Sequence, residues 1–280
     1  MRRTPRRTTD RGRPARRDGA RARAARKNRL GGILIGVFVV FLAGGLGLLG
    51  YAWATAPDLD TATGCPRSGP SSVTAVLVDA TDGMSPVQAL AVRKRLRELR
   101  DAVPTGGAFE VYRVGPAALE PLAAACNPGR AAEGSVWTQN RRLLGERFEA
   151  AFEAPIEAAL AGLEGGAPAD SSPILESLKS VAVSAFEGTG RSDRPHRLVV
   201  VSDMLQHTSG WSNYREPLDA ARLLKSDDYR RTAPDLRGAE VEILYLARRT
   251  AKPIQGRAHV AFWRDVLVAA GVQDLRFKQL

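Results

Sequence analysis

Two aspartates that follow apolar runs are the residues best suited to chemistry in this sequence. Asp79 follows the run Val73–Val78 and opens the segment Asp-Ala-Thr-Asp-Gly-Met-Ser, which ends at Ser85. Asp203 follows a second run, Arg197–Ser202. Carboxylate and hydroxyl oxygens are the ligands that a hard cation such as Mg²⁺ takes in proteins. Two such segments side by side would therefore form an oxygen-rich pocket.

Alternating strand and helix patterns over residues 73–280 would bring these aspartates together. We expect strands at Val73–Val78, Phe109–Val114 (half-buried, from its alternation), Leu119–Cys126, Arg197–Ser202, Val241–Leu246 and, at an edge, Val272–Phe277. We expect helices at Pro86–Asp101 (N-cap Ser85), Asn140–Leu163, Ser172–Phe186 and Ala258–Ala270. This alternation predicts a doubly wound α/β domain with a mostly parallel sheet. Ligands bind such sheets beyond the carboxyl ends of the strands, where the strand order reverses.

The acidic segments resemble those of the von Willebrand factor A-like domain family, in its membrane-anchored bacterial form. That family places Asp-x-Ser-x-Ser after the first strand, a Thr in a later loop and an Asp after the fourth strand, as a metal-ion-dependent adhesion site. Asp79 and Thr81 match the first Asp and the first hydroxyl. Ser172, in Ser-Pro-Ile-Leu, stands where the family has the Thr that opens a helix, and Asp203 matches the late Asp. The resemblance covers essentially all of residues 73–280.

The resemblance implies that these four residues hold a divalent cation, Mg²⁺ or Mn²⁺, whose open coordination position accepts a carboxylate from a protein partner. One position departs from the pattern, because Gly83 stands where the family has its second hydroxyl. Asp82 and Ser85 are the neighbouring side chains that could substitute for it. A purely structural alternative is that the aspartates cap helix N-termini, where the helix dipole favours carboxylates.

The favoured function is therefore a non-enzymatic, protein-binding or scaffolding protein. The alternative is an extracytoplasmic, metal-dependent hydrolase that uses the same acidic pocket. A phosphatase of the haloacid dehalogenase type would need Asp-x-Asp after the first strand, and Thr81 occupies its second position. The three histidines follow no Gly-x-Ser-x-Gly elbow and, with two cysteines, have no zinc spacing.

The positive charge of the chain is confined to its first residues. Residues 1–29 hold thirteen Arg and Lys against two Asp, which equals the whole net charge of +11, so the remainder is formally neutral. A neutral domain lacks the basic surface that a phosphate backbone requires, and no nucleic-acid partner is expected; the alternative is that residues 1–29 alone bind nucleic acid. We expect the basic tail to contact anionic lipid headgroups, at about 1 kcal/mol per cation.

An uncharged stretch follows the basic tail and predicts one transmembrane helix over residues 30–55. No charged residue occurs from Leu30 to Pro57, and about 20 apolar residues suffice to cross the hydrocarbon core. The positive-inside rule then leaves the tail in the cytoplasm and places the domain outside it, anchored in the cytoplasmic (inner) membrane. A cleaved signal peptide is the alternative, but the apolar run is longer than its usual ~7–15 residues. Residues 56–72, rich in small polar residues, are predicted to be a linker.

The two cysteines and a group of aromatic residues complete the candidate residues. Cys65 and Cys126 both follow the anchor, and an even count in an oxidising compartment favours a disulfide over the alternative of two unpaired buried thiols. Trp211 and Tyr214 lie in a polar segment just after Asp203. We expect them to contact a partner if they are exposed, as suits a protein interface, and the alternative is that they cover the core.

Overall fold

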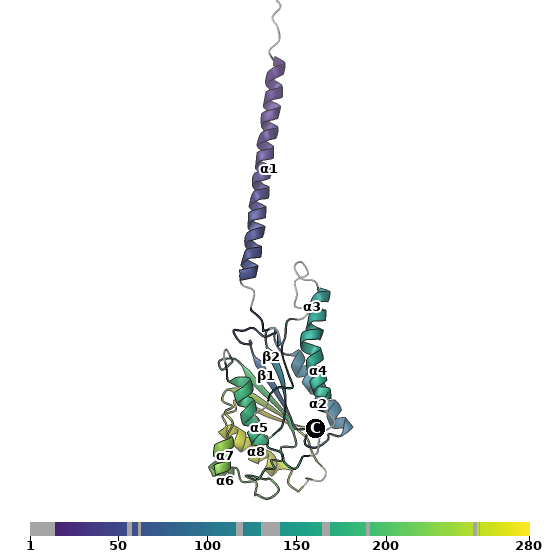
Figure 1. The fold of residues 1–280 in the computed structure, drawn as a ribbon, viewed down its shortest axis with the longest axis vertical. Coiled ribbons are helices and arrows are strands. Elements are labelled where there is room, and N and C mark those ends of the chain that lie inside the picture. The colour runs from purple at the N-terminus through teal and green to yellow at the C-terminus, as the bar shows by residue number, and fades with distance from the viewer. Residues whose placement is uncertain are drawn as a thin grey trace, which may run out of the picture. The chain divides into compact units, whose positions relative to one another are not determined.

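The chain forms two units, Met1–Pro57 and Asp58–Leu280, and each is described by itself. The computed structural model describes residues 15–54, 58–60, 63–115, 120–129, 141–163, 169–188, 191–248, 251 and 253–280. Figure 1 shows a long helix in the first unit and a sheet with helices in the second.

The described part of the first unit is a single helix, α1, which spans Ala15–Ala54. Its window Leu34–Tyr51 has a mean hydropathy of 2.2 and none of it is buried, so the helix is long and apolar enough to cross a membrane. Forty residues of helix extend about 60 Å, roughly twice the thickness of the hydrocarbon core. The helix thus begins within the basic tail rather than at residue 30. Residues 1–14 of the tail lie outside the described residues.

A six-stranded sheet forms the centre of the second unit and confirms the predicted doubly wound fold. Its strands are β1 Val73–Val78, β2 Ala108–Arg113, β3 Ala123–Cys126, β4 His196–Ser202, β5 Ala239–Tyr245 and β6 Asp274–Gln279. Their order in the sheet is β3-β2-β1-β4-β5-β6. All neighbours pair in parallel except β2 and β3, which are antiparallel. The strand order reverses between β1 and β4, and β6 is an edge strand as predicted.

Helices pack on both faces of the sheet. They are α2 Pro86–Asp101, α3 Arg141–Phe148, η1 Glu149–Glu153 (a π-helical turn), α4 Ala154–Ala161, α5 Ile174–Val181, η2 Ala182–Phe186 (π-helical), α6 Ala220–Lys225, α7 Asp227–Thr232 and α8 Arg257–Ala269. α3, η1 and α4 run on directly from one another where the sequence predicts one helix, whose first residue, Asn140, lies outside the described residues. Leu119, the predicted start of the third strand, also lies outside them.

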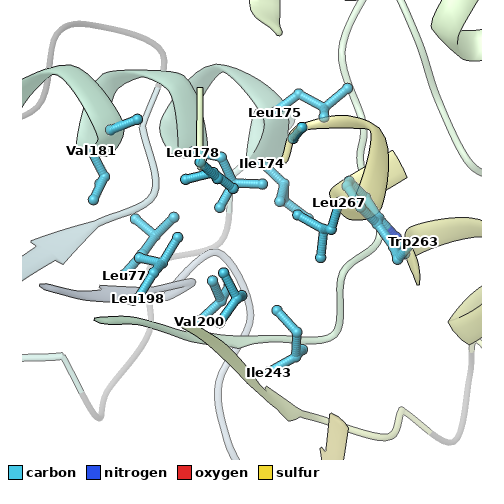
Figure 2. Packing of buried hydrophobic residues seen from close by; sticks show 14 of the residues in the cluster. Leu77, Ile174, Leu175, Leu178, Val181, Leu198, Val200, Ile243, Trp263 and Leu267 are labelled. Carbon is cyan, nitrogen blue, oxygen red and sulfur yellow. The ribbon is translucent and has the colours of Figure 1, made fainter. Parts of the chain in front are cut away.

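Alternate residues of the strands belong to two separate hydrophobic cores, one on each face of the sheet. In β1, Leu77 joins the core beneath α5 and α8, whereas Val76 and Val78 join the core beneath α2 and α4. Figure 2 shows Leu178 and Val181 of α5 lying over strand residues of the first core. A parallel sheet covered on both faces requires such continuous apolar strands.

The prediction that β2 is half-buried is wrong. Five of its six residues, Ala108–Tyr112, are buried and only Arg113 is exposed. The strand is internal, between β3 and β1, and helices cover both faces of the sheet. Even Glu110 is buried there, where its carboxylate pairs with Arg191 at 2.7 Å. A buried ion pair thus produced an alternation that looks like solvent exposure.

The described part of the predicted linker is held against the sheet. The contacts of the chain assign it to the globular unit from Asp58 onward. The predicted disulfide between Cys65 and Cys126 is confirmed and ties the segment to β3. The amide of Cys126 also donates to the carbonyl of Thr63 at 2.9 Å. This attachment lies beside the amino ends of β1 and β2, at the opposite edge of the sheet from Asp79 and Asp203.

Candidate functional site

The carboxyl ends of β1 and β4 bring the two aspartates to one place. These neighbouring strands pair in parallel, with Val78 opposite Val201, and each is followed by an aspartate. The amide of Asp79 donates to the carbonyl of Val201 at 2.8 Å, which continues the strand pairing to the pocket. The strand order reverses here, as expected for a binding site in a doubly wound sheet.

Asp79 is buried and its carboxylate accepts four hydrogen bonds. Its Oδ1 accepts from the hydroxyl of Thr81 at 2.6 Å and from the amide of Thr81 at 3.1 Å. Its Oδ2 accepts from Ser202 at 2.8 Å and from Ser172 at 3.2 Å. The side chain is 1% exposed, so these neutral donors replace its lost hydration. Three of the four predicted site residues therefore lie together.

Ser172 reaches Asp79 because its backbone is paired with the loop that follows β4. Ser172 and His207 exchange two backbone hydrogen bonds, of 2.8 and 2.9 Å. Pro173 follows and α5 then begins, so the serine stands at the entrance to a helix as the resemblance implies. The pairing brings a loop about ninety residues distant in sequence to the end of β1.

Asp203, the fourth predicted residue, has a different set of partners. Its Oδ1 accepts from the amide of Leu205 at 3.0 Å, and its Oδ2 accepts from Nε of Arg248 at 3.0 Å. Burial raises the pKa of Asp203, the charge of Asp79 raises it further, and the contacts with Leu205 and Arg248 oppose the rise. The charge of Asp79 thus affects Asp203, although no group hydrogen-bonds both carboxylates.

The turn after Asp203 is conformationally unusual. Met204 has φ of 59°, in the left-handed region that residues other than glycine rarely adopt. Its amide donates to Ser202 Oγ at 2.8 Å, and its carbonyl accepts from Trp263 Nε1 at 2.7 Å. Residues held in such conformations by their surroundings cluster at functional sites.

Arg248 and Gln255 belong to the site and were missed by the sequence predictions. The Arg248 guanidinium bonds Asp203 and donates to the carbonyls of Gly83 and Asp82 in the loop after β1. Gln255 donates to the carbonyl of Asp203 and accepts from the amide of Arg248. Arg248 follows shortly after the predicted strand Val241–Leu246. The rule that carboxyl ends of parallel strands meet at one edge was the signal that could have found it.

The two predicted substitutes for the missing hydroxyl do not reach Asp79. Ser85 caps α2, where its side chain accepts from the amide of Gln88 and its own amide donates to the Gln88 side chain. This confirms the predicted N-cap and is the pair of contacts known as a capping box. Asp82 is exposed and takes part through its carbonyl, which accepts from Arg248 at 3.3 Å.

The donor set, as arranged, does not fit a divalent cation. Gly83 provides no hydroxyl, and the guanidinium of Arg248 lies on the carboxylate and carbonyl oxygens that a cation would need. Within the described residues, no three His, Cys, Asp or Glu side chains form a cluster with metal-binding geometry. Binding of Mg²⁺ or Mn²⁺ by Asp79, Thr81, Ser172 and Asp203 therefore stays a prediction that needs a direct test.

The two predicted partner-contact residues lie in different environments. Tyr214 is 55% exposed, contacts His207 edge-on, and has a pKa raised by partial burial and then by the charge of Asp203. Trp211 is only 4% exposed and stacks against Phe262 in the core, so its prediction as a surface contact is wrong. Its large apolar ring is more stable inside the domain than on a polar loop.

A cavity of about 580 Å³ adjoins the site on the side of Arg248. It lies at the carboxyl ends of β5 and β6 and the start of α8, and its wall includes Arg248, Arg257 and Arg264. Arg257 and Arg264 are exposed, and neither has an ion-pair partner among the described residues. The cavity wall is therefore positively charged.

Comparisons with known proteins give similarities to solved structures alone. No protein-family model matches the sequence, and no curated protein is significantly similar to it. One similar structure is the von Willebrand factor A domain of SpRpn10, with 11% identity, a TM-score of 0.42, and coverage of 75% of this chain and 87% of that chain. Another is an aerotolerance-related membrane protein from Bacteroides fragilis, with 11% identity, a TM-score of 0.36, and coverage of 74% and 90%. A third is the conserved hypothetical protein BatB from Bacteroides thetaiotaomicron, with 10% identity, a TM-score of 0.39, and coverage of 76% and 90%.

Proposed function

From a globular unit with a von Willebrand factor A-like fold, we propose that this chain is a single-pass membrane protein that binds or scaffolds another protein. The docking surface is the carboxyl edge of the sheet, formed by the loops after β1, β4 and β5. We call this surface the carboxyl edge and define it by Asp82, Gly83, Asp203, Tyr214 and Arg248.

The observation that carries this proposal is the set of bonds that joins the three loops. Asp79 bonds Ser202 across β1 and β4, and Arg248 bonds both Asp203 and the loop that contains Gly83. Binding costs less when the contact surface is already ordered, because fewer side chains and loops must be immobilised. A rigid surface made of loops is what a binding module on this fold requires.

The exposed ring of Tyr214 and the cations of the adjoining cavity favour a partner with acidic side chains. Tyr214 offers a half-exposed aromatic ring, and tyrosine and arginine are among the residues that contribute most to protein interfaces. Arg257 and Arg264 in the adjoining cavity have no ion-pair partner among the described residues. A partner's carboxylate in this cavity would pair with them, and arginine binds carboxylates through two parallel hydrogen bonds.

We further propose that α1 anchors the protein in the cytoplasmic membrane, with the tail in the cytoplasm and the globular unit outside. The thirteen cations before the apolar stretch support this orientation, since positively charged flanks remain on the cytoplasmic side. The disulfide supports it independently, because disulfides persist in oxidising compartments.

The geometry of Asp79 argues against the hydrolase alternative. A nucleophilic carboxylate must present an oxygen to its substrate, but both oxygens of Asp79 are taken by four hydrogen bonds. The side chain is also almost fully buried. No observation at the pocket favours a hydrolytic role over binding.

Crosslinking in the membrane tests the docking surface. The full-length anchored protein is compared with Tyr214→Ala, which removes an exposed ring, and with Asp203→Ala, which breaks the loop contacts. We expect each variant to reduce recovery of a specific crosslinked partner, with roughly tenfold weaker binding for Tyr214→Ala. The measurement is the yield of each crosslinked protein by quantitative mass spectrometry.

Val183→Ala is the matched control, because Val183 is an exposed apolar residue on η2, away from the pocket. It should leave the recovered partners unchanged. Equal recovery of the same partners by wild type, Tyr214→Ala and Asp203→Ala would rule out the carboxyl edge as the docking surface.

A further inference from the structure

The guanidinium of Arg248 makes the contacts that a bound cation would make in this pocket. Its Nε donates to Asp203 Oδ2 at 3.0 Å, and its terminal nitrogens donate to the carbonyls of Gly83 and Asp82. Carboxylate and carbonyl oxygens are also the groups that bind hard cations in proteins. One side chain thus joins the loop after β4 to the loop after β1.

The buried carboxylates of the pocket explain why a cation at this position is stabilising. Asp79 and Asp203 are both buried, and a buried carboxylate is costly unless it is paired or hydrogen-bonded. Asp79 is satisfied by neutral donors, whereas Asp203 has one backbone amide and Arg248. Within the described part of the chain, Arg248 forms an ion pair with Asp203, and no Arg or Lys forms one with Asp79.

Hydrogen bonds within the free protein hold Arg248 in place. Its amide donates to Gln255 Oε1 at 2.7 Å, and Gln255 Nε2 donates to the carbonyls of Asp203 and Leu246 at 3.0 Å each. The arginine side chain is only 14% exposed. A planar guanidinium held in this way presents its donors in fixed directions, which a lysine ammonium cannot do.

The positive charge also disfavours a second cation in the same place. A divalent ion at the oxygens of Asp203 and Gly83 would lie beside the guanidinium, and like charges at such short range repel strongly. Gly83 adds no hydroxyl that would compensate for this repulsion.

We propose that Arg248 is the resident cation of this pocket, so that the carboxyl edge keeps its shape without a divalent metal. The side chain takes the place that the family resemblance gives to Mg²⁺ or Mn²⁺. The proposal stands whether or not the carboxyl edge binds a partner, since it concerns the state of the free protein.

Direct measurement of Mn²⁺ binding tests the proposal on the full-length protein in a non-ionic detergent. After removal of metal with a chelator, the fraction of bound Mn²⁺ is read from the loss of the free-ion paramagnetic resonance signal. We expect no binding by wild type at millimolar Mn²⁺ and no change of its Tm. We expect Arg248→Met to lower Tm by on the order of 10 °C in chelator, because Asp203 loses its charge partner. Mn²⁺ should then bind this variant and restore part of the loss.

Arg197→Met is the matched control, because Arg197 pairs with Glu240 on the surface at the amino ends of β4 and β5. It should neither bind Mn²⁺ nor gain stability from it. Arg248→Lys keeps the charge and should still exclude Mn²⁺, which provides a readout if Arg248→Met does not fold. Binding of Mn²⁺ by wild type that is lost in Asp79→Asn would overturn the proposal. Equal Mn²⁺ behaviour of folded Arg248→Met and Arg197→Met would overturn it as well.

Discussion

Several buried polar side chains in the globular unit are hydrogen-bonded to other side chains. Asp79 bonds Ser202, and Asp203 bonds Arg248. His259 lies between the hydroxyl of Tyr245, at 2.7 Å, and the indole of Trp263, at 3.2 Å. Removing one partner of such a pair leaves the other buried and unsatisfied, which costs more than the bond itself contributes. Single substitutions at these residues should therefore have effects much larger than those of surface changes.

His259 should make the stability of the protein depend on pH. Burial lowers the pKa of His259 from 6.5 to about 4. The unfolded chain therefore takes up a proton at a higher pH than the folded chain. Protonation of His259 in the unfolded chain causes no loss of stability above pH 6.5. As the pH is lowered from 6.5 to about 4, it reduces the free energy of unfolding by roughly 3 kcal/mol in total.

The measurement is the free energy of unfolding of the full-length protein in detergent between pH 7 and pH 4. His259→Gln, which is polar but does not titrate, should lose the part of the pH dependence that comes from this side chain. Since carboxylates also titrate in this range, the difference between the two curves is the relevant quantity. Parallel curves for wild type and His259→Gln would contradict the prediction.

At the scale of elements, periodicity predicted the fold well and the site in part. The strands β1 and β4 were predictable because their apolar runs have few alternatives, and α2 because Ser85 and Pro86 mark its start. The aspartates were found because each directly follows a strand. Arg248 was missed because nothing local in the sequence specifies that its side chain turns toward Asp203. Trp211 was misplaced for a related reason, since a polar segment does not reveal which of its aromatic residues packs inward.

The disulfide should stabilise the globular unit at the amino ends of β1 and β2. Cys65 and Cys126 are 61 residues apart in sequence and hold the segment before β1 against β3. Crosslinking a loop of this length lowers the entropy of the unfolded chain, which corresponds to about 4 kcal/mol. We expect the double variant Cys65→Ser/Cys126→Ser to unfold at a Tm lower by on the order of 10 °C.

Thermal unfolding of the two proteins, each with and without reductant, measures this effect. Reductant should lower the Tm of wild type toward that of the double variant and leave the variant itself unchanged. A wild-type Tm that is insensitive to complete reduction of the bond would show that the disulfide contributes no stability.

At the scale of the whole molecule, charge and hydropathy are strictly segregated along the chain. All of the net positive charge lies in residues 1–29, an uncharged stretch follows, and the remaining residues are formally neutral. The apolar side chains of α1 are exposed to solvent over Leu34–Leu49, which would be unfavourable in water and is favourable in lipid. The globular unit, by contrast, buries apolar residues in two cores of its own.

This segregation predicts the orientation of the protein in the membrane. Moving thirteen cations across the bilayer is strongly disfavoured, so the tail should stay in the cytoplasm and the globular unit should be exported. Protease added to intact spheroplasts should therefore digest a tag placed after Leu280.

Replacement of the Arg and Lys residues of the tail by Gln removes the charge bias and should yield a mixed population, part of it protected until lysis. The disulfide gives a second readout, because export to an oxidising compartment lets it form whereas the cytosol keeps thiols reduced. The opposite orientation would be shown by a wild-type tag that resists protease in intact spheroplasts but is digested after lysis, together with reduced Cys65 and Cys126.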